Sequence, residues 1–252
     1  MRDIPQQERS QRKKNGLRIC ALTAVLSIVA MLLSPVITQD PSYHNFADRR
    51  AMLGVDNALN VLSNLPFLLV ALHGYYLLQR RALEVNVKSR SAYRIFYVSI
   101  GQVSFGSGYY HLAPTDQTLI WDRLPMTLAF MALVSIVIGE FIDKLIAQLL
   151  LIPLLILGLS SVVYWAYSGD LRFYALIQFY PMLAIVTLLI TFGATRRTAH
   201  YWWLLSAYIA AKLFEHFDLE IEQLLGAISG HPLKHLAAAI GVYHFTKGKI
   251  KC

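Results

Sequence analysis

The stretch LIWDRLPMTLAFMALVSIVI, residues 119–138, has the length that a single helix needs to cross a bilayer, about 20 residues. Two charged residues, Asp122 and Arg123, interrupt it close to its start. Ionisable side chains inside a membrane span are costly and commonly mark a functional site. The stretch therefore predicts a transmembrane helix that carries an acid near one end.

The rest of the chain repeats this apolar pattern. It has 252 residues, of which 56% are hydrophobic and 15% charged, and it is too apolar for an ordinary soluble domain of this length. We therefore expect an all-α integral membrane protein with eight spans. A count of seven is the alternative, because Lys212, Glu215 and His216 interrupt the seventh span and the eighth is short. The windows are 17–37, 57–79, 93–112, 119–138, 145–167, 171–194, 201–217 and 231–246.

The distribution of basic residues predicts the orientation of these spans. Lysine and arginine accumulate in loops that stay cytoplasmic. Most of the 23 basic residues fall on the cytoplasmic side if both termini are placed inside. This topology makes residues 1–16 and 247–252 cytoplasmic tails. Residues 17–37 are expected to be a retained anchor, because Ser34 and the residues after it do not form a signal-peptide cleavage site.

The net charge of +8 does not indicate nucleic-acid binding. The basic residues are spread over several short loops, where anionic lipid headgroups are the expected counterparts. Short loops and alternating charge suit a bacterial inner membrane, with the endoplasmic reticulum as the alternative. We expect the partners to be the membrane and a lipid substrate, and the sequence gives no oligomeric state.

Two pairs of polar residues share the outer end of the predicted spans with Asp122. Ser107 and His111 are four residues apart, as are His231 and His235. On a helix, this spacing places both side chains of a pair on one face. The topology puts all five residues at one level, just under the outer headgroups.

These residue types suit metal-assisted hydrolysis. Three neutral imidazoles with an open fourth position form a catalytic zinc arrangement, in which the pKa of bound water falls to about 7. Asp122 would then be the general base and Ser107 a donor to the oxyanion. Two alternatives stay open: a receptor-like or regulatory protein with a structural zinc site, and electron transfer through bis-histidine haem.

At the level of motifs, the chain resembles the alkaline ceramidase family, which belongs to a superfamily of membrane hydrolases that includes the adiponectin-type receptors. The resemblance implies a seven-helix domain over residues 46–246, with 17–37 as an additional helix. It also implies zinc bound by His111, His231 and His235, assisted by Asp122 and Ser107, and hydrolysis of the N-acyl bond of ceramide or a related lipid. The matching motifs are NVLSN (60–64), Ser107-x-x-x-His111, WDRLPM (121–126) and GHPLKH (230–235).

Other polar residues have structural interpretations. The family's dense acidic run is missing near Asp48 and Asp56, so we do not expect a calcium site, which needs six or more oxygen ligands. Lys212 and Glu215 are three apart and are expected to pair. The stripe Asn60, Ser63 and Asn64 predicts hydrogen bonds between helices, with support of the zinc site as the minority interpretation.

Overall fold

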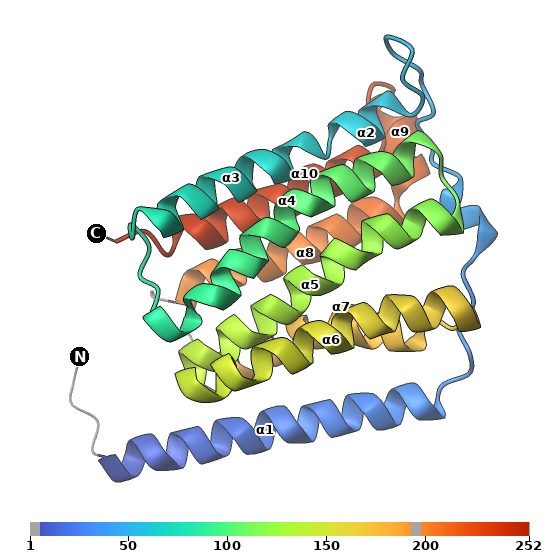
Figure 1. Ribbon diagram of the computed structural model, residues 1–252. Helices are drawn as coiled ribbons and strands as arrows, with labels where there is room; N and C mark the ends of the chain where they lie inside the picture. Colours follow the sequence, from blue (N-terminus) through green and yellow to red (C-terminus); the bar gives the residue numbers. More distant parts are fainter. Residues whose placement is uncertain (1–5, 193–197, 252) are drawn as a thin grey trace.

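The chain folds into an elongated bundle of long helices that run side by side (Figure 1). The computed structural model describes residues 6–192 and 198–251, and no β-strand occurs within these ranges. Residues 1–5 of the predicted tail, 193–194 of the sixth predicted span and Cys252 lie outside them. The helices are α1 (Gln6–Leu33), α2 (Ala58–Leu62), α3 (Leu65–Gln79), α4 (Arg90–Leu112), α5 (Asp116–Phe141), α6 (Lys144–Ser168), α7 (Arg172–Phe192), α8 (Ala199–His216), α9 (Asp218–Leu225) and α10 (Gly230–Lys247), with the 3-10 turns η1 (Pro41–His44) and η2 (Val87–Ser89).

Five helical segments in the described residues are both long and apolar enough to cross a membrane by themselves. The prediction of an all-helical chain with helices able to span a membrane is therefore confirmed. The count of eight stays a prediction, because α4, α8 and α10 are more polar than these five. The five segments are Ser10–Leu33, Ala58–Gln79, Asp116–Phe141, Lys144–Ser168 and Arg172–Phe192.

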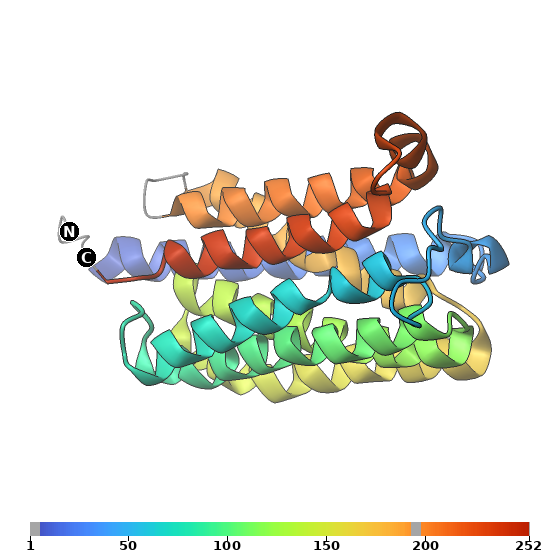
Figure 2. The same cartoon turned by 90° about the horizontal axis from the view of Figure 1, so that it is seen from above.

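Helix α1 lies at the edge of the bundle beside α7 (Figures 1 and 2). Most of its surface is open, and Leu32 is 65% exposed, as expected of a helix that faces lipid. Arg172 donates from Nη1 to Ser34 O at one end of α1 (2.8 Å), and Lys13 pairs with Asp143 near the other end (2.8 Å). The helix also begins well before residue 17, where its first span was predicted to start.

Two glycines bring the helices that carry the site into backbone contact. A Cβ atom on Gly106 of α4 would lie 2.1 Å from the Trp121 carbonyl oxygen of α5. A Cβ atom on Gly230, at the start of α10, would lie 2.0 Å from the Phe214 carbonyl oxygen of α8. Only glycine permits such close approach. α4 therefore packs tightly on α5, and α10 on α8; seen from above, α10 lies between α8 and α3 (Figure 2).

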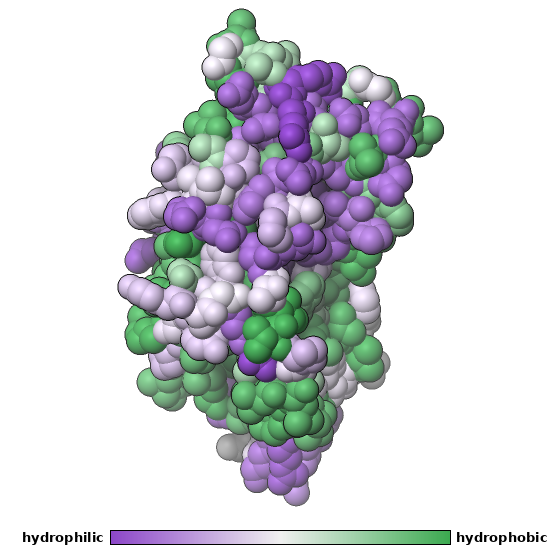
Figure 3. All heavy atoms as spheres, turned by 90° about the vertical axis from the view of Figure 1, so that its right-hand side faces the viewer, coloured by the Kyte–Doolittle hydropathy of each residue, from purple (hydrophilic) through white to green (hydrophobic). Residues whose placement is uncertain are grey.

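The two ends of the bundle differ in polarity. Figure 3 shows many polar side chains on the end where α5 begins. At the opposite end, Glu140 accepts hydrogen bonds from Tyr93 Oη (2.5 Å) and Tyr201 Oη (2.9 Å) and pairs with Lys249. This cluster ties α4, α5 and α8 to the C-terminal tail. Nothing in the spacing of these four residues predicted it.

Candidate metal centre

Three histidines meet inside the bundle at the end where α5 begins. His111 lies in the last turn of α4, and His231 and His235 lie in the first turns of α10. All three are buried, and one ring nitrogen from each can be chosen so that these atoms lie within 4.8 Å of one another. The i, i+4 spacing predicted that His231 and His235 would share a face. The predicted topology placed His111, from a helix more than a hundred residues earlier in the chain, at the same level, and the structure brings it together with them.

An aspartate from outside α10 fixes the start of that helix. Asp218 accepts a hydrogen bond from the His231 backbone N–H at Oδ1 (2.6 Å) and one from the Ala47 N–H at Oδ2 (3.0 Å). Its carboxylate thereby satisfies a free donor of the first turn, where the helix dipole favours negative charge. The sequence did not predict this bond, because Asp218 is 13 residues from His231 and local capping rules do not reach that far.

Ser63 determines which nitrogen of His235 is free. The Ser63 hydroxyl donates to Asn60 O (3.0 Å), and its oxygen lies 2.8 Å from His235 Nδ1. Because a hydroxyl has one proton, it accepts from Nδ1–H of His235. This tautomer leaves the Nε2 lone pair available to a metal. Ser63 therefore contacts a histidine of the candidate site, as the minority interpretation expected. Asn64, in contrast, bonds locally: its Nδ2 donates to Asn60 O (2.7 Å).

The donor set fits zinc. Three imidazoles converge, and the buried Nδ1 atom of His111 has no hydrogen-bond partner among the described residues. Zinc favours histidine nitrogen and commonly takes three protein ligands when a fourth position serves water or substrate. His231 Nε2 accepts from Lys234 Nζ (2.9 Å), so this nitrogen can bind a metal only after Lys234 turns away. Lys234 Nζ also donates to Glu215 Oε1 (3.1 Å), which is the partner left to this ammonium when it turns away from His231.

Ser107, Asp122 and His235 line one cavity of about 420 Å³. The Ser107 and Asp122 side chains interact with each other at this cavity. The structure thus brings the predicted acid and serine to the same cavity as a predicted ligand histidine. Their catalytic roles stay predictions.

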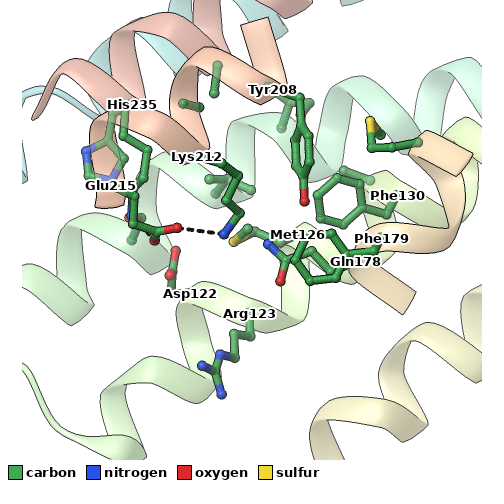
Figure 4. Close-up of a pocket in the computed structure, with 18 of the residues that line it drawn as sticks. Asp122, Arg123, Met126, Phe130, Gln178, Phe179, Tyr208, Lys212, Glu215 and His235 are labelled. Atoms are coloured by element: carbon green, nitrogen blue, oxygen red, sulfur yellow. Dashed lines mark hydrogen bonds and ion pairs between the residues drawn. The ribbon is translucent and has the colours of Figure 1, made fainter. Parts of the chain in front are cut away.

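The cavity has a polar end and an apolar end. Asp122, Glu215 and His235 lie at one end, while Phe130 and Phe179 lie at the other (Figure 4). A volume of this order is typical of a small-molecule site, in which apolar walls hold the ligand and a few polar groups orient it.

Glu215 accepts hydrogen bonds from two lysines and a tyrosine at the polar end. It accepts from Lys212 Nζ (2.6 Å), Lys234 Nζ (3.1 Å) and Tyr43 Oη (3.2 Å). The predicted pairing of Lys212 with Glu215 is confirmed. Lys234 and Tyr43 were missed, because they come from α10 and η1 and no sequence spacing relates them to α8.

The loop before α2 holds the acidic residue considered for calcium. Asp48 is 1% exposed, and the Arg50 guanidinium donates to both of its oxygens, from Nε to Oδ1 (2.9 Å) and from Nη2 to Oδ2 (2.6 Å). These bonds hold the pKa of the Asp48 carboxyl below its usual value. Asn57 Nδ2 donates to the His111 carbonyl oxygen (2.9 Å), so the loop supports the end of α4.

The fold and the site define an all-helical protein with helices able to cross a membrane and with a buried three-histidine cluster able to hold a metal, of which His235 lines the polar end of an apolar cavity. Residues 55–248 match the family described as Ceramidase, and the chain belongs to this family. The resemblance to alkaline ceramidases is thereby confirmed. The match runs from just before α2 to the end of α10 and leaves out α1. No curated protein matches the chain.

Proposed function

We propose that the protein is a zinc-dependent membrane amidase that hydrolyses the N-acyl bond of ceramide or a related lipid to a fatty acid and a sphingoid base or other amine. One observation carries the proposal: three buried histidines offer nitrogens within 4.8 Å of one another, and one of them, His235, lines the polar end of an apolar cavity, in a chain of the Ceramidase family.

Each polar residue then has a task. Zinc held by His111, His231 and His235 would polarise the carbonyl and lower the pKa of water. Asp122 takes the proton from the attacking water and returns it to the leaving amine. Ser107 donates a hydrogen bond from its hydroxyl to the oxygen anion that develops on the carbonyl and keeps its proton. Ser63 keeps the His235 ring in one tautomer and one orientation.

The cavity walls hold the acyl chain. Residues of α7 and α8 meet at the apolar end, where the Phe179 and Tyr208 rings pack edge to face with centroids 6.4 Å apart. Apolar walls exclude bulk water and strengthen the electrostatic interactions at the polar end. In the proposed eight-span topology, with both termini in the cytoplasm, this polar end lies under the outer leaflet of a bacterial inner membrane.

The test is hydrolysis of N-acyl lipids by purified protein in detergent. His235→Ala and Asp122→Asn are each expected to lower kcat/KM by about a hundredfold or more, because each removes a group that acts on the reacting atoms. His73→Ala is the matched control, since His73 is exposed on α3 and does not line the cavity. Unchanged turnover in both site variants contradicts the proposal.

A structural metal site is the second candidate, because the histidines join α4 to α10 and a metal would cross-link these helices. In that case chelation lowers the Tm, while the zinc-loaded protein hydrolyses neither lipid amides nor lipid esters.

A further inference from the structure

Cations outnumber acids among the residues that line the cavity. Three of the lining side chains carry a positive charge and two carry a negative charge. A buried charge is costly in a low-dielectric interior unless an opposite charge is close to it. The lining residues concerned are Arg123, Lys212 and Lys234, and Asp122 and Glu215.

Two lysines share one carboxylate. Lys212 and Lys234 both donate to Glu215, and the described residues place each lysine in an ion pair with no other acid. Lys234 also contacts His231, whereas Lys212 has no contact with a proposed metal ligand and has the more exposed side chain, 37% against 18%. Lys212, which Figure 4 shows bonded to Glu215, is therefore the lysine with more freedom to turn towards a ligand.

Arg123 is the third cation of the lining, and the described residues place it in no ion pair. It is 5% exposed and donates from Nη2 to the neutral amide of Gln39 (2.6 Å). Its guanidinium lies against the rings of Trp165 and Tyr174, 4.1 Å and 4.6 Å from their centroids. Nη1 is buried and has no hydrogen-bond partner in the described part of the chain. The rings favour a cation here, but they bring no negative charge.

A bound metal would increase this surplus, since neutral imidazoles do not cancel the charge of a divalent ion. A neutral sphingoid head could accept hydrogen bonds from the lysines without neutralising them. An anionic group on the ligand would accept hydrogen bonds from the lysines and also neutralise their charge, through charge-assisted bonds.

We infer that the substrate is an N-acyl lipid whose amine part bears an anionic group, a carboxylate or a phosphate, and that Lys212 and Arg123 select for it. This inference rests on the proposed function for the bond that is cleaved, but the binding preference is independent of catalysis. Lys212 and Arg123 are specificity-determining residues and take no part in the proton transfers.

The test compares three lipids with one acyl chain: N-hexadecanoylethanolamine, N-hexadecanoylglycine and N-hexadecanoyl-O-phosphoethanolamine. All three contain the same amide. The first is neutral, the second carries a carboxylate and the third a phosphate. Binding to the metal-free protein is measured by calorimetry in a non-ionic detergent, and kcat/KM is measured on the zinc-loaded protein.

One or both anionic lipids are expected to bind about tenfold more tightly than the neutral lipid and to have the higher kcat/KM. Lys212→Met should weaken binding of the anionic lipids by a larger factor than binding of the neutral lipid, and so reduce this preference. Lys212→Arg, which keeps the charge, should preserve it and controls for misfolding. Arg123→Gln should also reduce it, whereas Lys88→Met, in the exposed turn before α4, should not.

Equal binding of all three lipids, or equal losses for neutral and anionic lipids in Lys212→Met, overturns the inference. The proposed function fails separately: if no lipid is hydrolysed while the anionic lipids still bind more tightly, the charge selection stands and the amidase assignment falls.

Discussion

The Ser63 hydroxyl accepts a hydrogen bond from Nδ1 of His235 over 2.8 Å, and this bond reaches from the junction of α2 and α3 to α10. With Nδ1–H of His235 engaged in this bond, the lone pair on Nε2 is the one available to a metal. Residues that hydrogen-bond to metal ligands commonly affect metal affinity as strongly as activity.

Ser63→Ala is therefore expected to weaken zinc binding by about tenfold to a hundredfold and to reduce activity at limiting zinc. Competition with a chromophoric chelator measures the affinity. Ser161→Ala is the control, since Ser161 is also buried but bonds only within α6. If zinc affinity is the same in Ser63→Ala and Ser161→Ala, the assigned role of Ser63 is wrong.

Removal of the metal should loosen the contact between α4 and α10. We expect chelation to lower the Tm of the protein, because the metal binds the folded state only. Without chelator, His111→Ala should already have the lower Tm of the metal-free protein, and chelation should not lower its Tm further. Differential scanning fluorimetry with and without chelator checks this, with His73→Ala responding like the unchanged protein. A chelator-induced decrease that persists in His111→Ala contradicts the assigned ligand.

Gly106→Ala and Gly108→Ala form a matched pair two residues apart on α4. The added methyl group of Gly106→Ala meets the Trp121 carbonyl oxygen at 2.1 Å, whereas the methyl group of Gly108→Ala has nothing within 4 Å. The first should destabilise the protein by about 1–3 kcal/mol and separate Ser107 from Asp122. The second should be neutral or slightly stabilising, because alanine favours a helix. Similar Tm values and activities for the two variants would show that the close approach is unimportant.

The bond between Arg50 and Asp48 should make stability depend on pH. The Arg50 guanidinium lowers the pKa of Asp48 from its ordinary value of 3.8, so the stabilisation is present above that pH and is lost as the pH falls through the lowered pKa. The decrease in Tm caused by Arg50→Met is expected to be largest near neutral pH and to shrink below about pH 4. Lys88→Met should give no such pH-dependent difference. A constant effect of Arg50→Met at every pH excludes the ion pair as its cause.

The sequence by itself determined features that repeat over one or two helical turns. Apolar runs of bilayer length indicated membrane helices, and i, i+4 spacing placed His231 with His235 and Ser107 with His111. The pairing of Lys212 with Glu215 followed from the same geometry. Motifs at the helix ends indicated the resemblance to the alkaline ceramidase family.

Only the tertiary structure decided which residues of other helices those helix faces contact. Ser63 reaches His235 across 172 residues, and Lys234 joins Glu215 although 19 residues separate them. Gly106 packs on Trp121 because two backbones approach there, which no helical period encodes. Such contacts depend on how whole helices pack, and local periodicity carries no information about helix order or rotation. The charge surplus of the cavity became visible only after α5, α8 and α10 were brought together.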